Sequence, residues 1–251
     1  MRGVIRQIGA DWLSFLFPQY CELCGSNHDI NGYVCKKCTQ TWERIEAPFC
    51  ACCGKPFADA WADDALCLDC RDKKRAVDFA RSVWKNEGEA RRLLHEFKFQ
   101  RKLYWRDTFV HGLIEVLTLL PEFQSQKGWV VIPIPSDLRS FRRRGFNQAQ
   151  LLAKPIAKHF GLGLMQPLKR LSSSREQKEL SRQARWKHAK ESYALKSTYN
   201  GSSCLQGVSV LLIDDVMTTG ATFEACASLL KKHMGVSRVL ALSIVRGVSF
   251  T

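Results

Sequence analysis

Two adjacent carboxylates in the last fifth of the chain have the chemistry to bind a sugar. Asp214 and Asp215 end an apolar run, and such a pair can accept hydrogen bonds from the vicinal hydroxyls of a ribose or hold a divalent cation. A loop of small and hydroxyl residues follows: Thr218, Thr219, Gly220, Ala221 and Thr222. Its backbone N–H groups can surround a phosphate at the start of a helix. The order of these groups predicts a site for a sugar that carries a phosphate.

A second kind of chemistry is metal binding. Nine of the eleven cysteines lie between residues 21 and 70, in paired C-x-x-C units. The pairs form two sets of four: Cys21, Cys24, Cys35, Cys38 and then Cys50, Cys53, Cys67, Cys70. Each set has the ligands for one tetrahedral Zn²⁺, so we expect two consecutive zinc ribbons. Interleaved ligation, with the first and third pairs sharing an ion, stays open, and Cys52 is expected to be a thiol without a ligand role.

Two basic segments could bind phosphates. The first is an expected loop over residues 136–145 that contains Arg139, Arg142, Arg143 and Arg144. Arginine forks suit bidentate contacts to phosphate, so this loop suits a pyrophosphate or a nucleic-acid backbone. A solvated basic loop without a ligand is the simpler alternative.

The second basic segment spans residues 169–190. Its candidate nucleic-acid contacts are Lys169, Arg170, Arg175, Lys178, Arg182, Arg185 and Lys187. Trp186 and Tyr193 lie among or after them, and basic residues interleaved with aromatic rings suit single-stranded nucleic acid. An exposed charged helix is the alternative reading.

Composition is consistent with both kinds of site. The chain has 251 residues, 45% of them hydrophobic, which is enough for a substantial core and two domains of unequal size. Its formal net charge of +14 attracts polyanions such as nucleic acid. The sequence lacks the G-x-x-x-x-G-K-[ST] pattern, which argues against a P-loop NTPase.

Apolar and amphipathic runs predict the elements that position these residues. Strands are expected at residues 79–84, 129–134, 208–213 and 238–245. Helices are expected at residues 89–100, 103–120, 147–159 and 222–233, with Asn147 as the cap of the third. Strands that are apolar throughout favour a parallel sheet with helices on both faces. Open sheets of this kind bind ligands beyond the carboxyl ends of their strands.

The same patterns divide the chain into three parts. Residues 1–20 are expected to form an amphipathic helix, residues 21–75 the double zinc ribbon and residues 76–251 the α/β domain. Paired thiols that bind metal, and an N-terminus without a convincing signal-peptide cleavage site, indicate a cytoplasmic protein. The expected helix at residues 1–20 would also allow the protein to bind peripherally to the inner membrane.

The motifs, in this order, resemble the ComF family of competence-associated proteins. They are the paired four-cysteine ribbons, V-I-P-I-P with RRRGFNQAQ, the basic segment from residue 168, and LLIDDVMTTGAT. The last of these also resembles the phosphoribosyl pyrophosphate (PRPP) signature of type I phosphoribosyltransferases. The resemblance implies a type I phosphoribosyltransferase fold behind the zinc ribbons, and a role in natural transformation after DNA has entered as a single strand.

Carried over by position, the resemblance also implies residue roles. Asp214 and Asp215 would bind the ribose hydroxyls or an associated Mg²⁺, and residues 218–222 would hold the 5-phosphate. Arg139 and Arg144 would contact the pyrophosphate. The family implies no established reaction, and no catalytic residue is assigned.

The expected function is a DNA-uptake protein that binds single-stranded DNA and carries a PRPP pocket with Mg²⁺. The alternative is an active phosphoribosyltransferase that moves ribose 5-phosphate from PRPP to an unknown acceptor. Expected partners are single-stranded DNA, PRPP or a related phosphorylated ribose, and a transformation helicase or inner-membrane DNA channel.

Overall fold

The computed structural model describes residues 20–27, 30–31, 33–57, 65–71, 73–125, 128–171, 182–199 and 204–247. Nearly all of the helix expected over residues 1–20 lies outside these ranges, and so do Arg175 and Lys178. The side chains of Arg182, Arg185 and Lys187 are also outside the described set.

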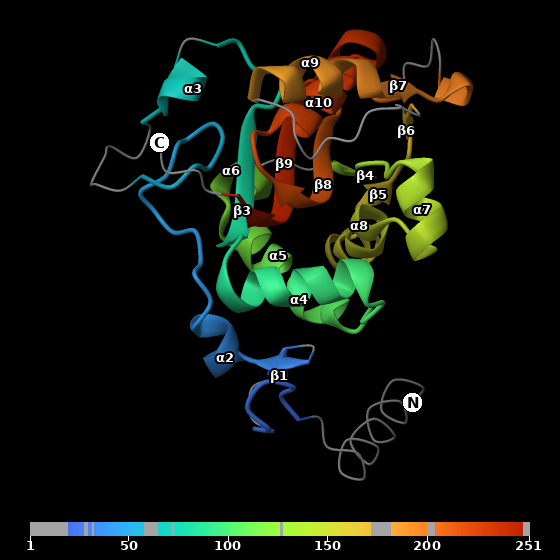
Figure 1. The fold of residues 1–251 in the computed structure, drawn as a ribbon. Coiled ribbons are helices and arrows are strands. Elements are labelled where there is room, and N and C mark those ends of the chain that lie inside the picture. The colour runs from blue at the N-terminus through green and yellow to red at the C-terminus, as the bar shows by residue number, and fades with distance from the viewer. Residues whose placement is uncertain are drawn as a thin grey trace, which may run out of the picture.

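A five-stranded parallel sheet forms the centre of the molecule (Figure 1). Its strand order is β3 (Phe79–Lys85), β9 (Arg238–Arg246), β8 (Ser209–Met217), β4 (Val130–Pro133) and β5 (Gly163–Leu164). The two middle strands are rich in Val, Leu and Ile and are buried along nearly their whole length, as strands covered on both faces should be. The predicted parallel sheet is confirmed.

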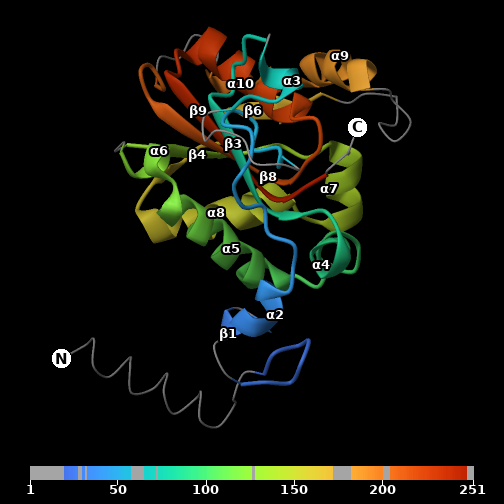
Figure 2. The same cartoon turned by 90° about the vertical axis from the view of Figure 1, so that its left-hand side faces the viewer.

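Helices cover both faces of this sheet (Figure 2). One face carries α10 (Ala221–Met234) with α9 (Arg182–Ser192) beside it. The other face carries α4 (Gly88–Phe99), α5 (Trp105–Leu119) and α8 (Gln148–Phe160). The side chain of Asn147 accepts a hydrogen bond from the Ala149 N–H at 3.1 Å, which confirms the predicted cap. Pro121 ends α5 and begins the short helix α6 (Pro121–Gln124).

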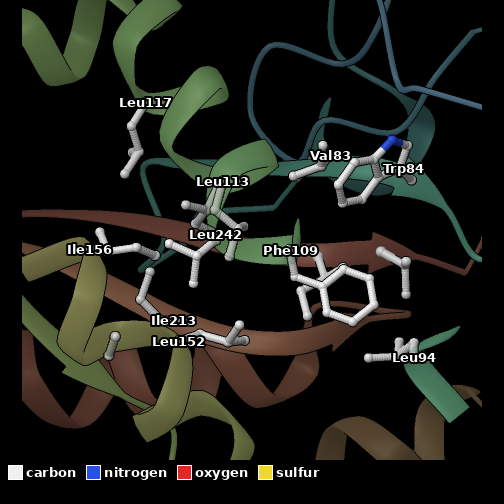
Figure 3. Packing of buried hydrophobic residues seen from close by; sticks show 14 of the residues in the cluster. Val83, Trp84, Leu94, Phe109, Leu113, Leu117, Leu152, Ile156, Ile213 and Leu242 are labelled. Atoms are coloured by element: carbon white, nitrogen blue, oxygen red, sulfur yellow. The ribbon is translucent and has the colours of Figure 1, made fainter. Parts of the chain in front are cut away.

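The core below the sheet is built around aromatic and branched side chains from β3, α5, α8 and the middle strands (Figure 3). Phe109 and Leu113 of α5 are fully buried and face Ile213 and Leu242. The Trp84 ring lies 6.2 Å from the Phe109 ring in an edge-on arrangement. This core holds β8, and therefore the carboxylates of that strand, in a fixed position relative to the helices.

Several short elements were not predicted. The strands β6 (Leu168–Arg170) and β7 (Tyr193–Leu195) form an antiparallel pair beside α10, followed by the 3-10 turn η2 (Ser197–Tyr199). Strand β5 has two residues. Runs this short carry no periodicity that a sequence pattern could show.

The cysteine-rich segment contacts both a helix and the edge strand of the α/β domain. It contains β1 (Ile30–Asn31), β2 (Val34–Cys35), α2 (Lys36–Gln40) and α3 (Leu68–Arg71). The Tyr33 N–H donates to Thr108 Oγ1 of α5 at 3.1 Å. The chain between the two cysteine sets runs antiparallel to β3, where the Ile45 N–H donates to the Val83 carbonyl at 2.9 Å.

Candidate ligand site and metal centres

The paired carboxylates lie within the central strand rather than at its end. We expected the strand to stop at Ile213, but the ladder with β9 continues to Met217, which pairs with Arg246. Successive side chains of a strand point to opposite faces of the sheet. The side chains of Asp214 and Asp215 therefore lie on opposite faces of the sheet.

Asp215 faces the side covered by α4. Its Oδ2 atom lies 3.0 Å from Nζ of Lys98, and these two side chains are 12% and 17% exposed. Burial lowers the pKa of Arg144, and the charge of Asp215 partly opposes this fall, so the Arg144 guanidinium lies within electrostatic reach of Asp215. Sequence reasoning missed Lys98, since nothing in its own helix indicates a partner on a strand far along the chain.

Asp214 faces the side covered by α10. Burial of its carboxyl, together with the charge of Asp215, raises the pKa of Asp214 to about 8. Its Oδ1 atom accepts a hydrogen bond from the Asp215 N–H at 2.9 Å. At neutral pH a carboxyl with this pKa holds its proton, so Asp214 is largely uncharged there.

The loop after β8 has the geometry of an anion site. Gly220 adopts a left-handed backbone with φ of 77° at the N-cap of α10, a conformation that glycine reaches without strain. Thr219 Oγ1 accepts from the Ala221 N–H at 3.3 Å. Within the described chain, the N–H groups of residues 218–220 make no backbone hydrogen bond. The positive end of the helix dipole and these N–H groups together favour a phosphate.

The arginine-rich segment is a helix, not the predicted loop. Helix α7 (Leu138–Arg144) begins at Asp137, whose carboxylate accepts from the Ser140 N–H at 2.7 Å, and ends at Gly145 with φ of 85°. Capping groups at both ends explain why seven residues form a helix here. The fold of the segment was therefore predicted wrongly, although its position after β4 was predicted correctly.

The helix separates the four arginines into different environments. Arg144 is half-buried, stacks on the Phe99 ring at 4.8 Å and leaves its buried Nε atom without a partner in the described chain. Arg143 also covers Phe99, at 5.4 Å, but is exposed like Arg142. Arg139 is exposed at the start of the helix. Of the two predicted pyrophosphate contacts, Arg144 lies within reach of the charge of Asp215, and the role of Arg139 stays a prediction.

The second basic segment reaches the same side of the molecule. Arg170 on β6 lies 3.8 Å from Asp137 at the start of α7, and its guanidinium lies 5.6 Å from the Tyr193 ring centre. Its neighbour Lys169 is exposed. The pair of Arg170 and Asp137 thus places β6 beside the start of α7, and the basic residues of these two elements, Arg142, Arg143, Lys169 and Arg170, are called the basic surface below. The predicted contacts between residues 175 and 187 are not described and stay predictions.

The eight predicted cysteines form two compact clusters. Cys21, Cys24, Cys35 and Cys38 make one, and Cys50, Cys53, Cys67 and Cys70 make the other, with all ligand atoms of a cluster within 4.8 Å of one another. This grouping follows the order of the chain, so interleaved ligation is wrong. Four thiolates at this spacing fit a tetrahedral Zn²⁺. Cys52 belongs to neither cluster, as expected.

Backbone N–H groups and one arginine surround the second cluster. The N–H groups of Cys53 and Cys67 donate to Sγ of Cys50 at 3.5 and 3.4 Å. Arg246, at the end of β9, donates to the Cys53 carbonyl at 2.6 Å and lies 3.4 Å from Sγ of Cys53. Such contacts orient metal ligands and offset their charge. They also join the metal centre to the strand next to β8.

A double zinc ribbon ahead of a parallel sheet with helices on both faces defines the class of protein. Residues 12–71 match the Double zinc ribbon domain family. With the topology described above, the predicted fold class, a type I phosphoribosyltransferase-like sheet behind a double zinc ribbon, is confirmed.

The chain is similar over most of its length to curated bacterial proteins. It is 26% identical to Competence protein ComFC of Bacillus subtilis over 85% of this chain and 84% of that protein. It is 27% identical to Competence protein F of Haemophilus influenzae over 90% of this chain and 96% of that protein. The DNA utilization protein YhgH of Salmonella typhimurium is 27% identical over 86% of this chain and 92% of that protein. These relatives confirm the resemblance to the ComF family.

Solved structures similar to this chain include two adenine phosphoribosyltransferases. The protein from Leishmania tarentolae is 17% identical and gives a TM-score of 0.38 over 66% of this chain and 78% of that one. The protein from Saccharomyces cerevisiae is 14% identical and gives a TM-score of 0.36 over 60% of this chain and 72% of that one.

Among the described residues, none of the helices has the length and apolar character needed to cross a membrane.

Proposed function

We propose that this protein acts in natural transformation, where it binds single-stranded DNA that has entered the cell and a phosphorylated ribose such as PRPP. The relatives that carry the names competence protein and DNA utilization protein support this role. The proposed place of action is the cytoplasmic side of the inner membrane, with a transformation helicase or a DNA channel as partner.

The observation that carries the ribose site is the arrangement of charges around Asp215. Three groups complement one ligand: a carboxylate balanced by Lys98, an arginine beside it, and a loop that begins three residues further on, whose N–H groups make no backbone hydrogen bond within the described chain. Residues 218–222 would bind the 5-phosphate, and Asp215 would accept from a ribose hydroxyl. Arg144 would bind the pyrophosphate, and Asp214 and Asp215 could hold an associated Mg²⁺, which would offset the charge of the phosphates. Arg139, at the start of α7, would be a further contact to the pyrophosphate.

The basic surface formed by α7 and β6 is the proposed DNA site. Its arginines and lysine would bind backbone phosphates, while exposed rings nearby would stack on bases. This surface adjoins Arg144, so DNA and the phosphorylated ribose would bind next to each other. The residues at 175, 178, 182, 185 and 187 would extend the surface.

An active phosphoribosyltransferase is the second candidate, favoured by the position of Arg144. A cation next to the ribose site could stabilise the charge that develops when the bond between C1 and the pyrophosphate oxygen breaks. Release of pyrophosphate from PRPP, dependent on an added acceptor and lost in Arg144→Ala, would support this function. Binding of PRPP without any such release supports the binding role alone.

Calorimetry with PRPP and Mg²⁺ tests the ribose site. Asp215→Asn should weaken binding by about tenfold or more, because an amide is a poorer acceptor than a charged carboxylate. Asp107→Asn, which alters an exposed carboxylate on α5 paired with Arg106, is the matched control. Equal affinity of the wild type and Asp215→Asn would contradict the proposed site.

A further inference from the structure

The two cysteine clusters lie against different sides of the α/β domain. Figures 1 and 2 show α2, which contains Cys38 of the first cluster, on the side of α4 and α5, and α3, which contains Cys70 of the second cluster, on the side of α10. Cysteines of the second cluster and residues 218–220 of the proposed phosphate loop line one cavity. The second cluster is therefore the one that faces the loop.

A first connection between the second cluster and the loop runs through the end of β9. The Arg246 guanidinium is buried, donates to the Cys53 carbonyl at 2.6 Å and lies 3.4 Å from Sγ of Cys53. In the sheet Arg246 pairs with Met217, and the Gly247 N–H donates to the Met217 carbonyl at 2.8 Å. Thr218, the first residue of the loop, follows directly. A displacement of Cys53 would therefore reach the loop through one side chain and one step of the sheet ladder.

A second connection runs through Glu224 in the first turn of α10. Its buried carboxylate accepts from the N–H groups of Ala76 and Val77, at 2.6 and 3.3 Å. The residue before them, Arg75, donates through Nη2 to the carbonyl of Asp69 in α3 at 2.7 Å. The chain that leaves the second ribbon is thus attached to the first turn of α10, whose N-terminus is the proposed phosphate site.

The cavity makes these two connections more important. Its walls include three cysteines of the second ribbon on one side and residues 218–220 on the other, so part of the space between ribbon and loop has no packed side chains. Arg75, Glu224, Arg246 and Gly247 line the same cavity, so both connections pass along its walls. A void supplies no contacts of its own. The position of the loop relative to the ribbon therefore depends on the groups at the edges of the cavity.

The second ribbon depends on its metal more than the first does. Among the described residues, its own core consists of cysteines together with the partly buried Phe57 and Leu66. The first cluster instead shares the large core of the α/β domain through Cys21 and Cys35. Small four-cysteine units fold with their metal, because the binding energy of the ion is also folding energy. Without its zinc ion, the second ribbon would lose the structure from which both connections start.

We propose that the second zinc ion keeps the phosphate loop in its binding conformation, and that Arg246 and Glu224 are the positioning residues that join them. This inference rests on the proposed phosphoribosyl site and adds that one of the two metal ions controls it. Removal of zinc from the second cluster would lower the affinity for the 5-phosphate of a ribose, and removal from the first would not. The affinity of the site would thereby follow the zinc occupancy of the second ribbon.

The test combines zinc content by native mass spectrometry with affinity for ribose 5-phosphate by calorimetry, both on the full chain. Cys67→Ser in the second cluster should lower the zinc content from two ions towards one and weaken ribose 5-phosphate binding by about tenfold or more. Cys24→Ser in the first cluster is the matched control, which should also lose one ion but change the affinity by less than about twofold. Equal effects of the two variants on affinity would overturn the proposal.

A change to Arg246 tests the connection itself, since it leaves all eight ligand cysteines in place. Arg246→Gln should keep both zinc ions and still weaken ribose 5-phosphate binding by about fivefold or more. Arg246→Lys keeps the charge and should restore part of the affinity. Hydrogen exchange should become faster at the first N–H groups of α10 and stay unchanged in α5. Arg238→Gln, at the other end of β9, should behave like the wild type in each measurement.

The outcomes distinguish a failure of this inference from a failure of the proposed site. If Arg246→Gln binds ribose 5-phosphate like the wild type, the positioning role is overturned and the phosphate site stands. If the wild type does not bind ribose 5-phosphate, the proposed phosphoribosyl site fails. Hydrogen exchange then still tests the link to zinc, because Cys67→Ser alone should speed up exchange at the start of α10 if the second ion holds the loop. Unchanged exchange in that variant would overturn the link.

Discussion

Nζ of Lys98 lies 3.0 Å from Oδ2 of Asp215, across the interface between α4 and the central strand. Both side chains are more than four-fifths buried, so the pair is poorly screened by solvent. Lys98 occupies one side of the Asp215 carboxylate, at the site proposed for a phosphorylated ribose. A ligand must therefore share the carboxylate with Lys98 or displace it.

Removal of Lys98 should destabilise the protein. Lys98→Met leaves a largely buried carboxylate without its cation, so we expect unfolding by urea to show a loss of about 1–3 kcal/mol. Lys85→Met is the matched control, since its partner Glu43 is more than half exposed and the pair should contribute less than about 1 kcal/mol. Equal losses of unfolding free energy in the two variants would show that the buried pair of Lys98 and Asp215 stabilises the protein no more than an exposed pair does.

The raised pKa of Asp214 predicts a dependence of stability on pH. In the unfolded chain this carboxyl has its ordinary pKa of 3.8, and in the folded protein the pKa is about 8. Between these values the folded state holds the proton more tightly, so the contribution of Asp214 to stability falls as the pH rises and is constant above about 8. The amide of Asp214→Asn does not titrate, so the stability of this variant lacks that contribution to the pH dependence.

The comparison to make is urea unfolding of the wild type and Asp214→Asn at several pH values from 6 to 9, in buffer containing zinc. The variant should gain about 1–3 kcal/mol relative to the wild type over that interval, given a slope of roughly 1.4 kcal/mol per pH unit below the folded pKa. Parallel stability curves would mean that Asp214 is ionised throughout.

Zinc stoichiometry should separate ligand from non-ligand cysteines. Cys53→Ser removes one thiolate from the second cluster and should lower the metal content from two ions per chain towards one, since each cluster has four thiolates. Cys52→Ser alters the adjacent thiol, which lies outside both clusters, and should keep two ions. Mass spectrometry of the native protein measures both. Loss of zinc in Cys52→Ser would reassign the ligands.

The basic surface on α7 and β6 should determine how salt affects DNA binding. Arg142→Ala should weaken single-stranded DNA binding and reduce the slope of log affinity against log salt by about 0.7, because one phosphate contact and its counterion are lost. Lys158→Ala on α8 is also exposed but lies outside this surface, and its slope should match that of the wild type. Affinity that does not respond to salt in the wild type would contradict the phosphate contacts altogether.

Local patterns explain why much of the fold was predictable. The apolar run that precedes Asp214 and the run that begins at Arg238 both form the long middle strands, because only a doubly covered strand accommodates so many branched residues. The metal clusters were predictable for a similar reason, since C-x-x-C spacing brings two thiols together within one turn. Asn147 was recognised because a cap acts on its own helix.

The parts that were missed depend on contacts between distant segments. Helix α7 has seven residues and four arginines, so its pattern resembled a loop, and its caps at Asp137 and Gly145 were not weighed. Lys98 was visible only as a cation on an amphipathic helix, and its pairing with Asp215 depends on how α4 packs against the sheet. The cavity of about 430 Å³ between the second cysteine cluster and the loop before α10 has walls from five separate stretches of chain, and no pattern within one stretch shows that the five meet.

The antiparallel contact between the linker of the two ribbons and β3 also affects how the molecule meets other molecules. Hydrogen bonds from Ile45 to Val83 and from Lys85 to Glu43 cover the outer edge of β3, so another strand cannot pair there. At the opposite edge of the sheet, β5 offers two residues, too few to template a foreign strand. Among the described residues, the central sheet is therefore protected at both ends against edge-to-edge aggregation, and the zinc-binding segment provides half of that protection.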